Sequence, residues 1–199
     1  MIVIERDFYM RDTLEVSKDL LGTILVHETP EGTVKGRIVE VEAYIGPGDA
    51  ASHAYRNLRS KRTAVQFGPG GFSYVYFIYG MYYCMNIVTN LPARPEAVLI
   101  RALEPVEGVG LMQERRGTHK LTNLCSGPGK LCAAMGIDKS CYGLDLCGSS
   151  LYLEYGEPLD KSLITAAKRI NIDYSGEAKD YEWRFYIEGN PHVSVKKRT

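Results

Sequence analysis

The sequence lacks long apolar segments. No apolar run approaches the roughly 20 residues that a membrane-spanning helix needs. The N-terminus, MIVIERDFYMRD, carries acidic residues where a secretory signal would have an apolar stretch. The sequence therefore predicts neither a membrane span nor a signal peptide, and we expect no membrane partner.

Metal-binding motifs are missing as well. No two of the five cysteines form a C-x-x-C pair, and none of the four histidines belongs to an H-E-x-x-H motif. We therefore expect neither a metal site nor another cofactor. Because the number of cysteines is odd and the sequence carries no secretory signal, we expect reduced thiols and no disulfide framework.

An excess of charge of either sign is also absent, with 24 basic and 24 acidic residues. The basic residues are nevertheless clustered, in His53–Arg62, which contains no acidic residue, in Arg115–Lys120 and in Lys196–Arg198. A neutral protein with one basic face can bind a polyanion locally. Scattered solvated charge is the alternative interpretation, and composition does not separate the two.

Length and composition predict one α+β domain that spans residues 1–199. The chain is 45% apolar, and its 20 glycines and 9 prolines indicate many turns. Successive strands joined by short turns favour antiparallel pairing. We expect a curved, mainly antiparallel sheet resembling an open barrel, with peripheral helices and a protruding β-hairpin.

The expected elements follow from caps, turns and alternation. The predicted helices are Asp12–Leu21, Val106–Arg116 and a helix opened by Ser126–Lys130 that ends at Gly136. The predicted strands are Thr23–His27, Thr33–Tyr44, Phe72–Tyr79, Met81–Thr89, Glu96–Leu103, Leu151–Glu154, Trp183–Ile187 and His192–Val195. Ser162–Arg169 is ambiguous, and Gly46–Arg62 is a polar loop.

The strand RIVEVEAY, Arg37–Tyr44, carries two glutamates on one face. Alternation puts Glu40, Glu42 and Tyr44 on the same side. One interpretation is a half-exposed strand with both glutamates in water. The other is that Glu42 is a general base beside an aromatic ring, which the Gly-Pro-Gly loop after the strand favours.

The hairpin YVYFIYGMYYCMN, residues 74–86, holds five tyrosines and one phenylalanine. Gly80 predicts a turn directly after Tyr79, so that ring lies near the tip and loses the burial that normally accompanies an aromatic residue. Wedge-like side chains on projecting elements part DNA base steps. The alternatives are that the tip folds back or meets a partner protein.

Two polar features leave alternatives open. Asn86 lies in the apolar segment CMNIV and needs hydrogen-bond partners, either the backbone or the polar edge of a ligand. Gly127–Lys130, GPGK, is not a Walker A motif, because Leu124 stands at its first glycine and Leu131 at its Ser/Thr. It is a helix cap or a phosphate-binding helix start.

Five segments occur in order along the chain: RIVEVEAYIGPGDAASHAY, YVYFIYGMYYCMNIV, VLIRALEP, LCSGPGKLCAAMGI and RFYIEGNPHVSV. Together they resemble the alkyladenine (3-methyladenine) DNA glycosylase family, the vertebrate-type enzymes and their bacterial relatives, over about residues 14–195. The resemblance implies a monofunctional hydrolase of base excision repair. Such an enzyme flips alkylated or deaminated purines, namely 3-methyladenine, 7-methylguanine, hypoxanthine and ethenoadenine, out of duplex DNA and hydrolyses their N-glycosidic bond.

The resemblance also implies site residues. Glu42 matches the general base, which would deprotonate a water held by Arg101 and by the backbone carbonyl of Val193. The residues implied to bind the extruded base are Tyr44, Ala51, His53, Tyr76 and Asn86, with Asn86 disfavouring normal purines.

Further implied contacts involve DNA itself. Tyr79 and Met81 would intercalate at the vacated position, and Arg56, Arg59, Arg62 and Lys130 are hypotheses for backbone contacts. The chain departs from its relatives in the loop 55–70 and at His192, where relatives carry a large aromatic residue. It also lacks the long N-terminal extension of vertebrate members. We therefore expect a minimal bacterial enzyme that acts as a monomer in the cytoplasm, on nucleoid DNA.

Two other classes of function remain open. A damaged- or single-stranded-DNA binding module would stack bases on the same rings without catalysis. Glu42 argues against it, because a carboxylate beside bases repels phosphates and has no use in pure stacking. A small-molecule transferase that uses GPGK for a phosphate is the other, and it would lack salt-dependent duplex binding.

Overall fold

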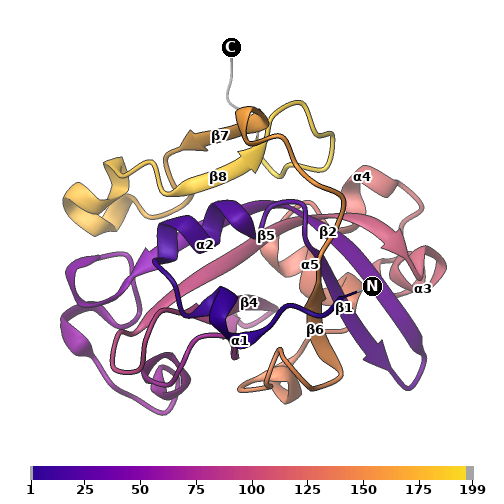
Figure 1. The fold of residues 1–199 in the computed structure, drawn as a ribbon. Helices are drawn as coiled ribbons and strands as arrows, with labels where there is room; N and C mark the ends of the chain where they lie inside the picture. The colour runs from indigo at the N-terminus through magenta and orange to yellow at the C-terminus, as the bar shows by residue number, and fades with distance from the viewer. Residues whose placement is uncertain (1, 196–199) are drawn as a thin grey trace.

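One long strand, β2 (Gly32–Ile45), organises the computed structural model, which describes residues 2–195. The sheet has the order β3-β4-β5-β2-β1-β6, and β8 pairs with both β2 and β7 (Figure 1). Every pairing between these strands is antiparallel. The other strands are β1 (Ile24–Thr29), β3 (Ser73–Ile78), β4 (Tyr82–Thr89), β5 (Glu96–Glu107), β6 (Leu151–Glu154), β7 (Ile164–Ala167) and β8 (Arg184–Ile187).

A bulge in β2 curves the sheet. The strand pairs with β1 up to Arg37 and with β8 from Glu40 to Glu42. Its register against β5 shifts twice between Ile38 and Val41. Because a bulge bends its strand and increases the local twist, β2 changes partners there and the sheet curls into an open half-barrel. The predicted α+β class with a curved antiparallel sheet is confirmed.

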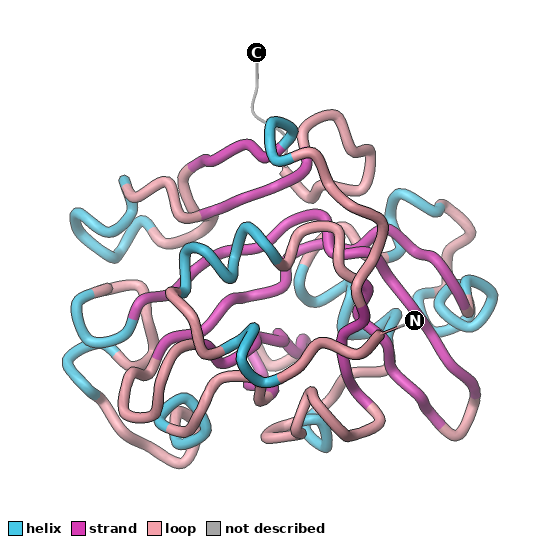
Figure 2. The backbone as a smooth tube through the Cα atoms, viewed as in Figure 1, coloured by secondary structure: helices cyan, strands magenta, loops and turns pink. Residues whose placement is uncertain are grey.

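The hydrophobic core covers one face of the central strands. It takes alternate residues from each of them, Val41, Val75, Met85, Ile87, Val98 and Ile100. Short helices lie around the sheet (Figure 2). They are α1 (Arg6–Tyr9), α2 (Thr13–Asp19), α3 (Val109–Arg116), α4 (Leu121–Leu124) and α5 (Pro128–Met135). The predicted cap of α2 is confirmed, since Asp12 accepts the N–H groups of Leu14 and Glu15.

The structure moves one predicted boundary, assigns one ambiguous segment and contradicts one predicted strand. The helix expected from Val106 begins at Val109, because β5 continues to Glu107 and Gly108 turns the chain with a φ of 70°. The ambiguous Ser162–Arg169 contains β7. His192–Val195 forms turns and no strand. Alternation predicted a strand here, but the N–H groups of His192 and Ser194 bond side chains and that of Val193 bonds the carbonyl of Asn190, so these groups do not pair with a neighbouring strand.

Two expectations on composition can be compared with the described chain. All five cysteines are free, as expected for reduced thiols. None of the helices within residues 2–195 is both long and apolar enough to cross a membrane. The basic cluster Lys196–Arg198 lies outside the described residues.

Candidate active site

A cavity of about 340 Å³ lies over one face of four adjacent strands, β3, β4, β5 and β2. Cross-strand pairing places one residue of each strand in a single row: Tyr74, Asn86, Leu99 and Glu42. Because side chains alternate between the two faces, residues two positions away share the cavity side. The cavity and the apolar core therefore occupy opposite sides of the same strands.

Segments outside the sheet enclose the cavity. They are the loop after β2, the tip of the β3–β4 hairpin, the start of α5 and the segment after β7. Their lining residues are Ala51, Ser52, His53, Tyr79, Pro128, Gly129, Ile170, Asn171, Ile172 and Tyr174. At Gly129 a Cβ atom would come within 2.9 Å of the Tyr82 ring, so only glycine lets α5 approach the hairpin this closely.

Glu42 lies directly behind the cavity lining and has no solvent exposure. Its carboxylate accepts the backbone N–H of Ile170 at 2.7 Å and the hydroxyl of Tyr44 at 2.8 Å. Nη1 of Arg101 lies 3.4 Å from the same carboxylate. All three partners line the cavity. Because Glu40 is also fully buried, the interpretation of two glutamates in water is wrong.

Arg101 bridges these two buried carboxylates. Its Nε lies 3.5 Å from Glu40, and its Nη1 faces Glu42. Burial disfavours the charge on Arg101, but the two carboxylates outweigh burial and raise its pKa. Glu40 in turn accepts Nη1 of Arg184 at 2.9 Å and the N–H of Ser194 at 2.6 Å. This network holds a permanent positive charge at the cavity.

Tyr44 borders the cavity at the end of β2. Burial, together with the adjacent Glu42 carboxylate, raises the pKa of Tyr44 well above its ordinary value. The hydroxyl therefore stays protonated and donates to Glu42 throughout the physiological pH range. This bond fixes the ring beside the carboxylate, as the shared face predicted.

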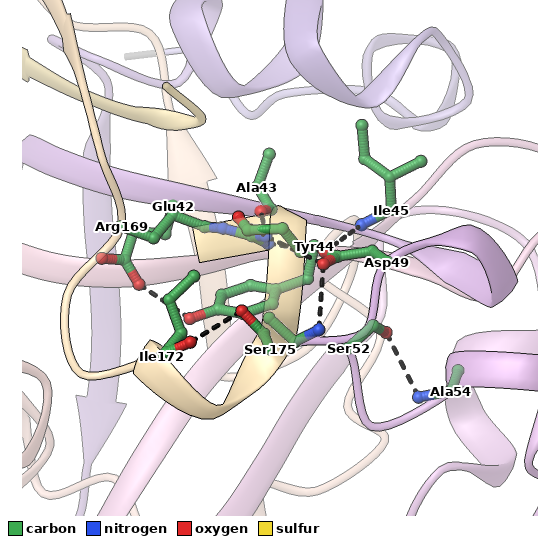
Figure 3. A network of polar contacts seen from close by, with 12 residues as sticks. Glu42, Ala43, Tyr44, Ile45, Asp49, Ser52, Ala54, Arg169, Ile172 and Ser175 are labelled. Carbon is green, nitrogen blue, oxygen red and sulfur yellow. Dashed lines mark hydrogen bonds and ion pairs between the residues drawn. The ribbon is translucent and has the colours of Figure 1, made fainter. Parts of the chain in front are cut away.

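Asp49 organises the loop that follows Tyr44. Its carboxylate accepts the backbone N–H groups of Ile45 at 3.2 Å and Ala51 at 3.0 Å. Arg169 donates to both oxygens of Asp49 and to the backbone carbonyl of Ala43. Figure 3 shows Asp49, Arg169, Ala43 and Ile45 gathered around Tyr44. The loop that carries Ala51 and His53 is thus fixed to the end of β2.

His53 and Tyr76 contact each other at 4.7 Å between ring centroids and at 82°. Nε2 of His53 lies 3.1 Å from Nη2 of Arg62, and Nδ1 lies 2.8 Å from the hydroxyl of Tyr74. Because arginine only donates, Nε2 accepts and Nδ1 carries the proton. Burial, with a contribution from Arg62, lowers the pKa of His53 to about 4. The imidazole is therefore neutral near pH 7.

Asn86 is buried in β4 and borders the cavity. Its Nδ2 donates to the backbone carbonyl of Tyr74 at 3.0 Å. The amide therefore bonds the backbone of the neighbouring strand, one of the two partners that the sequence left open. The same bond fixes the position of the side chain at the cavity.

The tip of the β3–β4 hairpin carries Tyr79 with 73% of its surface exposed. Three residues, Tyr79 to Met81, connect β3 and β4, and both Tyr79 (φ 55°) and Gly80 (φ 67°) lie in the left-handed region, as the central residues of a type I′ turn do. For a non-glycine residue this conformation costs roughly 1–2 kcal/mol. Met81, beside the turn, is 65% exposed. The predicted protruding hairpin is confirmed, and its tip exposes apolar groups at a conformational cost.

The four basic residues proposed for DNA contacts are differently placed. Arg62 lies over the ring of Tyr76 at 4.5 Å. Arg56 and Arg59 are exposed in the loop between β2 and β3. Lys130 donates to the side chain of Asn123 at 2.6 Å. Arg62 alone among them is thus joined to a cavity residue through contacts in the described chain.

Val193 is buried, and it is not among the residues that line the cavity in the described chain. The adjacent N–H of Ser194 bonds Glu40, so this segment packs beside the second glutamate. Within residues 2–195 no group of three or more histidine, cysteine, aspartate or glutamate side chains could hold a metal ion.

Sequence reasoning missed several residues of this site. Glu40 pairs with Arg101 and is itself bonded by Arg184. Asp49 and Arg169 fix the loop beside Tyr44, and Tyr174 lines the cavity while 73% exposed. In the sequence these look like ordinary surface charges and a loop tyrosine. Only the Gly-Asp step in GPGDAASH gave a local signal, since aspartate often bonds backbone N–H groups in turns.

Comparison with known proteins gives the family of the sequence. Residues 7–191 match the family described as Methylpurine-DNA glycosylase (MPG). A protein of Clostridium acetobutylicum is 51% identical over 97% of this chain and 98% of its own length. One of Alkaliphilus oremlandii is 52% identical over 97% and 99%, and one of Methanocella arvoryzae is 50% identical over 98% of each. All three are named "Putative 3-methyladenine DNA glycosylase". The chain therefore belongs to the methylpurine-DNA glycosylase family.

Proposed function

We propose that the protein is a monofunctional purine DNA glycosylase that excises 3-methyladenine, 7-methylguanine, hypoxanthine and ethenoadenine from duplex DNA by attack of water. Membership of the family makes it a DNA N-glycosylase, a hydrolase of base excision repair that acts on DNA with alkylated bases. The proposal adds the range of lesions, the nucleophile and the roles of individual residues.

One observation carries the proposal: a buried carboxylate lies directly behind a cavity bordered by aromatic rings. Tyr44 on one segment and Tyr76 with His53 on others supply the surfaces between which a flat purine would stack. A module that only stacks bases would have no use for Glu42 at this position. The cavity is also of the size that encloses a small ligand.

The chemistry assigns a role to each charged group. Loss of the base passes through an oxocarbenium-like sugar, which a nearby carboxylate stabilises. Glu42 would accept the proton of the attacking water, and Arg101 would orient the water and the adjacent phosphate. No lysine is among the residues that line the cavity in the described chain, which supports water and not a Schiff base as the nucleophile.

Base release from defined duplexes tests the proposal. The four substrates carry 3-methyladenine, 7-methylguanine, hypoxanthine or ethenoadenine, and each reaction is analysed with and without alkali. Release of the base, with strand breaks only after alkali, supports a monofunctional glycosylase. Breaks without alkali would point to a lyase. Salt-dependent binding without release of any base would identify the stacking module instead.

Tyr79→Ala is expected to weaken base extrusion, because the exposed ring would replace the extruded nucleotide in the base stack. The loss should be larger for hypoxanthine in a stable pair, about tenfold or more, than for ethenoadenine, whose pairing is already disrupted, since stacking is worth about 1–3 kcal/mol per base. Single-turnover rates on both duplexes measure the difference. The control is Tyr155→Ala, an exposed tyrosine outside the cavity lining. Equal losses on both lesions would contradict the wedge role.

Asn86→Ser is expected to relax discrimination against guanine. The shorter side chain loses the bond to the Tyr74 carbonyl and opens space where an exocyclic amino group would lie. Release of unmodified guanine should rise about tenfold, the scale of one hydrogen-bonded edge contact. Asn90→Ser, which alters another buried asparagine outside the cavity lining, is the control. Unchanged selectivity in Asn86→Ser would remove Asn86 from base discrimination.

A further inference from the structure

Arg169 is a completely buried arginine whose charge lies against an aromatic ring of the site. Its guanidinium carbon is 4.8 Å from the centroid of the Tyr44 ring and 5.1 Å from that of Trp183. Its side chain and that of Asp49 both have no solvent exposure. The guanidinium donates to Asp49, to the carbonyl of Ala43 and to a further carbonyl in η6 (Asp173–Asp180).

Arg169 contacts the Tyr44 ring without itself bordering the cavity in the described chain. Tyr44 lines the cavity, whereas Arg169 is not among its lining residues in the described chain and is closed off from solvent. Figure 3 shows Arg169 and Asp49 packed beside Tyr44. A base stacked on the cavity side of the ring would therefore share Tyr44 with a fixed guanidinium.

The charge at this position has a physical consequence for stacking. The face of a tyrosine ring attracts cations through its quadrupole. A guanidinium on one face draws electron density toward itself and repels a second cation approaching the other face. N-alkylated purines such as 7-methylguanine are cationic, whereas hypoxanthine is neutral. The bound arginine thus opposes cationic bases more than neutral ones.

We propose that Arg169 is a positioning and specificity-determining residue that acts through Tyr44 and lowers the preference of the cavity for cationic over neutral purines. The inference rests on the proposed function, in which Tyr44 stacks on the extruded base. It extends that function to the balance between lesion classes. A pocket in which the residue packed against Tyr44 had no charge would favour cationic bases more strongly. It would release neutral bases relatively slowly.

Asp49 completes this arrangement. It fixes the guanidinium at the ring and, through Ile45 and Ala51, ties the loop after β2 to it. Asp49 also supplies a counter-charge that moderates the positive field at Tyr44. Removing both charges should therefore raise the preference for cationic bases. Removing only Asp49 should lower it.

The test uses a double variant that carries both Arg169→Met and Asp49→Asn, which removes both charges at similar volume. This double variant is compared with the wild-type protein. Single-turnover release is measured on duplexes with 7-methylguanine and with hypoxanthine. We expect the ratio of the two rates to rise about threefold to tenfold, the range of a cation–π contribution. A loosened structure would slow both lesions without raising the ratio.

Two further variants of the pair and one control outside the cavity complete the test. Arg169→Lys retains a positive charge but loses the bidentate bond to Asp49, so its ratio should stay closer to wild type than that of the double variant, even if both rates fall. Asp49→Asn alone keeps the cation without its counter-charge and should lower the ratio, so the inference stays testable if the double variant does not fold. Arg6→Met with Asp145→Asn, a pair outside the cavity lining, should leave the ratio unchanged.

The outcomes separate this inference from the proposed function. A wild-type protein that releases both bases, with a ratio that is unchanged or lowered in the double variant, overturns the role of Arg169 alone. A raised ratio in the Arg6 and Asp145 control would also overturn it. Absence of base release from the wild type would contradict the proposed function itself.

Discussion

Glu42→Gln abolishes base release while binding to lesion DNA persists: this is the largest effect that we expect. Glutamine has nearly the same shape and can still accept the N–H of Ile170. It cannot take a proton from water, and it has no charge to stabilise the sugar cation. The loss of rate should therefore reach about 10²–10⁴-fold, the usual contribution of a general base. Single-turnover release and equilibrium binding on the same duplex measure the two effects.

The control for Glu42→Gln is Glu104→Gln. Glu104 accepts a bond from Asn190 and is not among the residues that line the cavity in the described chain. Its variant should release bases at the wild-type rate. Substantial turnover by Glu42→Gln would remove Glu42 from the mechanism. Loss of both binding and release would instead show that the substitution disrupts the pocket.

Asp49→Ala should produce the second large effect, a loss of about 3–5 kcal/mol in the free energy of unfolding. The substitution leaves the buried guanidinium of Arg169 without its counter-ion and two backbone N–H groups without acceptors. For a chain of this size such a loss lowers Tm by about 10 °C. Urea unfolding followed by circular dichroism measures the free energy.

Asp145→Ala is the matched control for Asp49→Ala. Asp145 pairs with Arg6 at 2.6 Å, but both side chains are partly exposed, at 45% and 28%. Exposed pairs contribute about 0–1 kcal/mol, so this variant should unfold close to wild type. A similarly small loss in Asp49→Ala would mean that the buried pair does not persist in solution, and the role inferred for Arg169 would lose its basis.

Local patterns predicted the parts of the fold that depend on neighbours in the sequence. The Tyr79-Gly80 step located the hairpin turn, and alternation along β2 put Glu42 and Tyr44 on one face. Asp12 marked the start of α2. These signals work because turn geometry, strand pleating and helix caps are set by residues close together along the chain.

Long-range contacts decided the rest. Glu40 and Glu42 could have faced water, but they bind two buried arginines instead. These arginines, Arg101 and Arg184, lie on β5 and β8. The bond between Asp49 and Arg169 joins residues 120 positions apart. Likewise the alternation in His192–Val195 could not show that the N–H of Ser194 would bond the side chain of Glu40, which is distant in the sequence. Pairing partners at such separations leave no trace in a single sequence.

Residues far along the sequence make the contacts that close the cavity, and this affects how the protein forms during synthesis. Glu42 receives the N–H of Ile170, Tyr44 is backed by Arg169, and β8 pairs with the bulged part of β2. A chain emerging from the ribosome therefore displays its hairpin and glutamate well before the pocket is closed. Because chains fold progressively from the N-terminus during synthesis, the pocket closes only after Ile170 and β8 have emerged. Incomplete products that stop before β7 would carry the exposed tip tyrosine together with a Glu42 carboxylate that lacks its bond from Ile170.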